Sequence, residues 1–198
     1  MHPYETIPLF TSGLLLAAWL IGTHLVMLLK PAETKDFLRK FPRNPIMGQV
    51  LLAIGLLWFW LLIAPSNWGP LSALAMDLGE FNKAKGALQI LVPVTLVAVV
   101  ISVRDFLAVR ALGLVGLMVA SPLLESAFLK DPASRVLVPI YAYALLTASM
   151  FWVGMPFLFR DAVTWATADS RRWNGLAFAG LAYGVATLLC ALLFWRGY

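Results

Sequence analysis

This chain has little of what disulfide-stapled and metal-binding proteins depend on. It contains one cysteine, Cys190, and two histidines among 198 residues, and only 13% of its residues are charged. A single cysteine excludes an intrachain disulfide and any metal site built from several thiolates. We expect Cys190 to be a small buried apolar side chain.

The sequence also lacks the short motifs of several enzyme classes. It has no His-Glu-x-x-His, no Gly-x-Ser-x-Gly and no Cys-x-x-Cys, so hydrolysis, metal catalysis and thiol redox chemistry lack their minimum residue sets. An enzyme would have to use scattered groups such as His24, Arg43 and Asp105. It has no Gly-rich phosphate loop and no aromatic RNA-binding signature, so we expect no nucleic-acid partner despite the net charge of +5.

What the chain does have is apolar sequence in long runs. Hydrophobic residues make up 61% of it, and the mean hydropathy is +0.84. A soluble domain of this size could not cover so much apolar surface. Each run is close to the roughly 20 residues that span a bilayer, and the short alternating segments of a membrane β-barrel are missing. We therefore predict one all-α, polytopic membrane domain over 1–198, a compact bundle of six transmembrane helices at about 7–29, 46–64, 87–103, 106–128, 136–159 and 175–195.

The loops between these runs alternate in Lys and Arg content. The first, third and fifth loops hold ten of the 15 basic residues, and the residues before the first span hold none. By the positive-inside rule, the odd loops are cytoplasmic and both termini lie on the non-cytoplasmic side of a plasma or inner membrane. The first run is too long for a signal peptide and lacks basic residues before it, so we interpret it as a true span.

Two loops have amphipathic patterns. Residues 70–83 place apolar side chains at helical spacing, which predicts an amphipathic helix on the outer surface. The first cytoplasmic loop predicts another, and its basic side is the candidate lipid-headgroup site, formed by Lys35, Arg39, Lys40 and Arg43. Cations near an anionic surface contribute about 1 kcal/mol each. The alternative is that these charges only set topology.

Each cytoplasmic loop also carries a basic residue followed by Asp. The pairs are Lys35-Asp36, Arg104-Asp105 and Arg160-Asp161, and the first two continue with Phe-Leu. The chain could therefore be three helical hairpins of one kind, each with its bend in the cytoplasm. The alternative is that such pairs are simply common where helices leave a membrane.

Polar residues inside the spans are the candidates for function because each is costly there. His24 could bind a porphyrin-type cofactor or a quinone, relay a proton, or only bond a neighbouring helix. Glu125 could bind a cation or a proton, or pair with Lys130 or Arg135. The remaining candidates serve contacts between helices: the amides Gln49 and Gln89, and the packing pair Gly180 and Gly184, which could face this chain or a partner subunit.

The ionisable groups of the spans lie near helix ends, and the span centres lack ionisable side chains. This favours a non-catalytic integral-membrane subunit of a larger membrane assembly. Its partners would be membrane lipids and either other membrane subunits or further copies of itself. The alternative is a small transporter or channel that uses His24 and Glu125, for which we would expect polar groups that converge near the midplane.

Overall fold

The computed structural model describes residues 2–65, 67–102 and 106–198, which form helices and no strand. Six of these helices are long and apolar enough to cross a membrane. They are α1 (Leu9–Leu29), α3 (Pro45–Leu62), α4 (Lys85–Ser102), α5 (Leu107–Ala127), α6 (Leu137–Gly154) and α8 (Ser170–Phe194). The prediction of an all-α polytopic bundle with six spans is confirmed.

The fifth span ends earlier than predicted, and the sixth begins earlier. The apolar run over 136–159 is divided because Met155 leaves helical geometry, with φ −130° and ψ 68°, and Pro156 follows it. The residues beyond form a separate helix, α7 (Phe157–Ala168). The last span starts at Ser170, where the Asp169 carboxylate accepts the Arg171 N–H at 2.9 Å as an N-cap.

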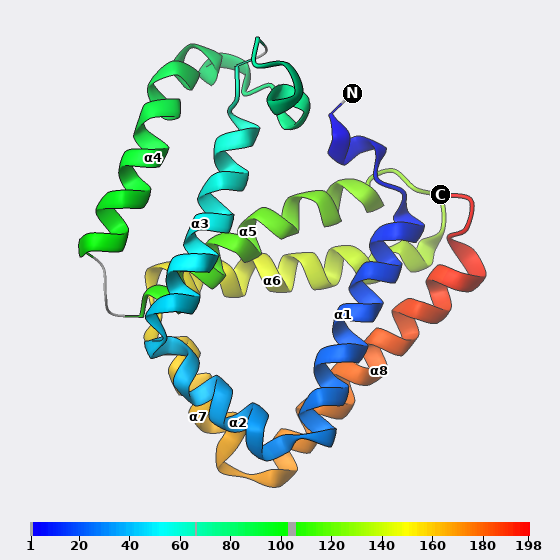
Figure 1. The fold of residues 1–198 in the computed structure, drawn as a ribbon. Coiled ribbons are helices and arrows are strands. Elements are labelled where there is room, and N and C mark those ends of the chain that lie inside the picture. The colour runs from blue at the N-terminus through cyan, green and yellow to red at the C-terminus, as the bar shows by residue number, and fades with distance from the viewer. Residues whose placement is uncertain (1, 66, 103–105) are drawn as a thin grey trace.

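The spans pack in two groups (Figure 1). The first and last, α1 and α8, lie side by side along most of their length, while α5 packs between α3 and α6. Helix α4 stands at the edge of the molecule and packs mainly against α3. Small residues allow these approaches: a Cβ at Gly48 would lie 2.8 Å from the Ala108 nitrogen, and one at Gly113 would lie 2.8 Å from the Ser149 carbonyl oxygen.

The predicted hairpins are not the packing units of this fold. Spans joined by a predicted cytoplasmic bend are α1 with α3, α4 with α5 and α6 with α8, and none of these is a main contact among the described residues. Of the three basic-Asp pairs, Lys35-Asp36 lies on α2 and Arg160-Asp161 on α7. The pair Arg104-Asp105 lies outside the described residues.

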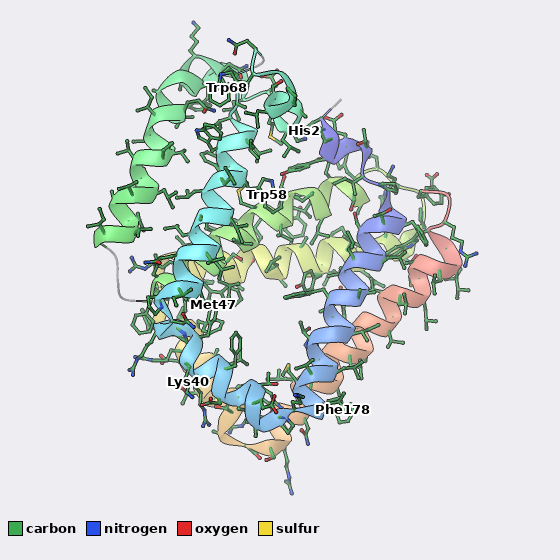
Figure 2. All side chains as sticks on the ribbon, in the orientation of Figure 1. His2, Lys40, Met47, Trp58, Trp68 and Phe178 are labelled. Atoms are coloured by element: carbon green, nitrogen blue, oxygen red, sulfur yellow. The ribbon has the colours of Figure 1, made fainter. Side chains whose placement is uncertain are left out.

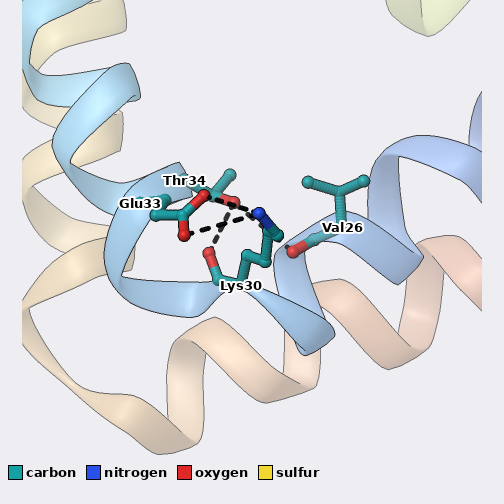
Figure 3. Close-up of polar contacts among 4 residues, drawn as sticks. All are labelled: Val26, Lys30, Glu33 and Thr34. Carbon is teal, nitrogen blue, oxygen red and sulfur yellow. Dashed lines mark hydrogen bonds and ion pairs between the residues drawn. The ribbon is translucent and has the colours of Figure 1, made fainter.

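Short helices join the spans on one side of the bundle. The amphipathic helix predicted in the first loop is present as α2 (Pro31–Lys40), followed by a 3-10 turn, η2 (Phe41–Arg43). The chain turns sharply between α1 and α2 (Figure 3), where the Thr34 hydroxyl donates to the Lys30 carbonyl at 2.8 Å and Lys30 pairs with Glu33 at 3.1 Å. Helix α2 contacts α7, and we call this side the α2/α7 face.

Both chain ends lie on the opposite side, which we call the termini face. The Phe10 N–H donates to the Tyr198 carbonyl at 3.2 Å, and the His2 ring bonds the Leu74 carbonyl at 3.0 Å. Figure 2 shows His2 near Trp58, at the opposite end of the molecule from Lys40. The N-terminal turn η1 (Pro3–Thr6) is fixed there, and burial raises the pKa of Tyr4, although a hydrogen bond from Trp58 opposes this.

The loop over 70–83 is not the continuous helix that its apolar spacing predicts. It forms two 3-10 helices, η3 (Gly69–Leu74) and η4 (Gly79–Ala84), with non-helical residues between them. The Asp77 carboxylate accepts the Asn82 side-chain N–H and the Gly79 backbone N–H, and Gly79 has a left-handed φ of +58°. These two bonds hold the pKa of Asp77 below its ordinary value, that from Asn82 contributing most.

Candidate functional site

His24 is a packing residue between the first and last spans. Its Nδ1 lies 2.7 Å from the Leu20 carbonyl oxygen on its own helix, and its ring rests directly on Gly180 of α8. Only glycine leaves room for the imidazole there, because a Cβ at Gly180 would overlap the ring. The geometry thus favours the interhelical contact over cofactor binding among the roles that the sequence left open.

The packing pair Gly180 and Gly184 faces this chain. A Cβ at Gly184 would lie 2.9 Å from the Leu20 Cβ and 3.1 Å from the Ile21 nitrogen. The small-residue face therefore serves the contact between α8 and α1, and it is not free for a partner subunit.

Glu125 lies at the termini face, far along the bundle from His24. It lines a hollow of about 710 Å³ together with His2, Glu5 and Asp77. Among the described residues it forms no ion pair with Lys130 or Arg135. The described residues contain no cluster of three or more His, Cys, Asp or Glu side chains that could hold a metal ion.

The two amides differ in use. Gln49 is exposed on α3 and does not take an interhelical position. Gln89 fastens α4 to α3 through a reciprocal pair: its Nε2 donates to the Trp60 carbonyl at 3.2 Å, and the Trp60 indole N–H donates to the Gln89 carbonyl at 3.2 Å. The Gln89 Oε1 is buried without a partner among the described residues.

The four candidate lipid-headgroup residues divide into two pairs. Lys40 is exposed and forms an ion pair with Asp36 at 2.6 Å. Lys35 lies 5.2 Å from the centre of the buried Trp173 ring as a cation–π contact. Arg39 and Arg43, one helical turn apart, line a common hollow instead.

This hollow, the arginine pocket, opens on the α2/α7 face and has a volume of about 260 Å³. Its walls come from α2, η2, the start of α5, and α7. Its lining residues are Leu38, Arg39, Pro42, Arg43, Phe106, Arg160, Val163 and Thr164. Three arginines from two segments that are far apart in the sequence thus line one hollow.

Aromatic packing beside the pocket holds these segments in place. Phe41 of η2 is buried against Phe159 of α7, with ring centres 5.7 Å apart, and both pack on Ala108 and Val109 of α5. Because Arg43 and Arg160 are close in the chain to these two rings, the same contact positions both guanidinium-bearing segments.

Sequence reasoning found two of the three arginines and missed Arg160. The sequence marks Arg160 only as a basic loop residue and as part of the Arg160-Asp161 pair. The available signal was the amphipathic pattern over 157–168, which mirrors that of α2. No protein-family model, curated protein or solved structure matches this chain.

Proposed function

We propose that this integral membrane protein is a non-catalytic subunit of a larger membrane assembly, and that α4 docks a transmembrane helix of another subunit. The observation that carries the proposal is the free face of α4. One side of this helix, with Val92, Leu96, Val99 and Val100, packs on the bundle. No described residue covers the opposite side.

The uncovered side has the pattern of a helix-packing seam. Ile90, Val94, Val97 and Ile101 follow one another at spacings of four, three and four residues. Their exposed fractions are 70%, 57%, 58% and 66%. This is the heptad spacing with which two helices interlock, and all four side chains are β-branched, so each loses little rotamer freedom when packed.

Lipid tails are as apolar as this seam, so exposure alone does not favour a protein partner. The regular spacing and stiff side chains do, because van der Waals packing is what drives association of helices in a bilayer. Helix α4 is also the span with the least contact to the rest of the protein: 6% of its most apolar 18-residue stretch is buried inside the protein, against 39% for α5. A partner helix would supply the second neighbour that most spans of this bundle already have.

The transporter alternative has less support. A transport site needs polar groups that converge near the midplane. His24 is engaged between α1 and α8, and Glu125 lies at the termini face, so these two candidates do not meet.

The test is purification in mild detergent from the cells that make the protein, followed by a native gel and mass identification. We expect a particle that contains more protein than one 21.8 kDa chain. Val94→Trp and Val97→Trp keep α4 apolar but prevent close approach of a partner, so they should release it. The matched control is Ile140→Trp, at a β-branched residue of α6 that is 53% exposed; it should retain the partner.

Two results would overturn the proposal. One is a wild-type chain that is extracted as a single copy without partners. The other is solute flux through liposomes that contain the purified chain alone, if His24→Ala or Glu125→Gln abolishes that flux while the protein stays folded. The second result would establish the transporter alternative.

A further inference from the structure

We propose that the arginine pocket binds a phosphate group, and that its natural source is the headgroup of an anionic membrane lipid. This inference does not depend on what covers α4. It concerns the charged groups of the α2/α7 face.

The first support is electrostatic. Arg39, Arg43 and Arg160 bring three positive charges to a hollow of about 260 Å³, and no carboxylate of the described residues lines it. Asp36 pairs with Lys40 outside the pocket at 2.6 Å, whereas Asp161 pairs with Arg160 itself at 2.8 Å. Arg39 and Arg43 therefore carry the pocket charge that has no carboxylate partner among the described residues. Like charges held together raise the free energy of the empty site, so a bound anion is favoured.

The second support is the supply of donors. A guanidinium has five N–H donors in a planar fork that matches phosphate oxygens. Arg39 is oriented by Thr167, whose hydroxyl accepts from Nε at 3.0 Å and whose carbonyl accepts from one terminal nitrogen at 3.3 Å. Among the described residues, its other N–H groups have no partner, and the Arg43 side chain has no hydrogen bond or ion pair.

The third support distinguishes a lipid from free phosphate. Half of the residues that line the pocket are apolar, namely Leu38, Pro42, Phe106 and Val163, so the site is amphiphilic like a lipid. Its volume is slightly below the range of about 300–1,000 Å³ for drug-sized ligands, which suits a single headgroup while the acyl chains stay in the bilayer. The amphipathic helices α2 and α7 that frame it are also of the kind that lies at headgroup depth.

A bound phosphate would join two parts of the bundle. Arg39 and Arg43 come from the connection between α1 and α3, and Arg160 comes from the connection between α6 and α8. One anion that accepts bonds from all three would hold these connections together across the α2/α7 face. We therefore expect the ligand to stabilise the folded protein as well as bind to it.

The experiment compares phosphate sources with the purified full chain in a neutral detergent. Thermal unfolding is followed with added phosphatidylglycerol, phosphatidylcholine, glycerol 3-phosphate or inorganic phosphate, and native mass spectrometry records retained lipid. Phosphatidylglycerol should raise Tm and remain bound, while phosphatidylcholine should do neither. The variants Arg43→Gln and Arg160→Gln should each weaken phosphatidylglycerol binding about 10-fold or more, because each removes a charge-assisted contact.

Lys40→Gln is the matched control, since it removes a cation of the same face that lies outside the pocket. Its affinity for phosphatidylglycerol should stay within about 2-fold of wild type. Equal losses in Lys40→Gln and Arg43→Gln would overturn the proposal in favour of diffuse surface charge, as would equal binding of the two lipids. A Tm rise with inorganic phosphate or glycerol 3-phosphate that matches phosphatidylglycerol, and disappears in Arg43→Gln, would support the phosphate site and identify free phosphate as the source. Arg43→Lys keeps the charge without the fork and should bind with intermediate affinity.

Discussion

Replacing Gly184 with alanine should force the first and last spans apart, although alanine is the better helix former. The added Cβ would lie 2.9 Å from the Leu20 Cβ and 3.1 Å from the backbone nitrogen of Ile21. Neither atom can rotate away, so the whole of α8 must move relative to α1. Overpacking of this kind typically costs about 1–3 kcal/mol.

Gly175→Ala is the matched control on the same helix. Nothing lies within 4 Å of a Cβ built there, so that variant gains helix propensity without a clash. The gain is about 1 kcal/mol and is common to both variants. The difference in unfolding free energy between Gly184→Ala and Gly175→Ala is therefore the overpacking cost alone, about 1–3 kcal/mol.

The neighbouring Gly180→Ala separates two kinds of clash. Its Cβ meets the His24 ring, a side chain that can be removed. A His24→Ala exchange should therefore recover part of the stability lost in Gly180→Ala but none of that lost in Gly184→Ala. Unfolding by heat or by a denaturing detergent, followed by tryptophan fluorescence, gives all these values. Equal stability of Gly184→Ala and Gly175→Ala would refute the α1–α8 packing.

Three further predictions follow from the loops and from α4. In a cysteine-free background, a cysteine at Lys40 should be shielded from an impermeant thiol reagent in intact cells and one at Ser134 labelled; the reverse would invert the orientation. Because the pKa of Asp77 is lowered in the fold, its stabilising bonds are complete above the ordinary Asp pKa and are lost as pH falls through the lowered value, which amide exchange at Gly79 should report. Gln89→Leu removes the bond to the Trp60 carbonyl and should weaken the packing free energy of α4 on α3 by about 1 kcal/mol. The measurement is the yield of an engineered α3–α4 crosslink, which should fall; an unchanged yield would count against the Trp60 pair.

The spans could be predicted from sequence because hydrophobic length is a local property that the bilayer imposes. The two departures from the predicted elements have local causes as well. At Met155 and Pro156 an apolar run continues after its backbone has left the helix, so hydropathy reports one span where there are two helices. In the 70–83 loop, Asp77 and Gly79 decide the backbone geometry, and the apolar spacing does not register their hydrogen bonds.

The candidate site could be predicted only in part because it depends on contacts between distant segments. The spacing of Arg39 and Arg43 predicts that they share a helical face, and they do line one pocket. Nothing in the sequence brings Arg160 to them, since that requires the Phe41–Phe159 contact between two loops. In the same way, nothing in the sequence predicts that His24 contacts Gly180, because that contact depends on the pairing of α1 with α8.

The pairing of α1 with α8 also has a consequence for biosynthesis. The ribosome makes α1 first, and every residue from Lys30 to Asp169 must follow before its main packing partner begins. At about 5–20 residues per second, α1 waits on the order of 10 s for α8. During that interval the imidazole of His24 lacks the surface of Gly180 that later covers it. We expect the insertion machinery to cover this polar ring in the meantime. Nascent chains halted before Ser170 should then keep α1 in contact with that machinery and release it once α8 has entered the membrane.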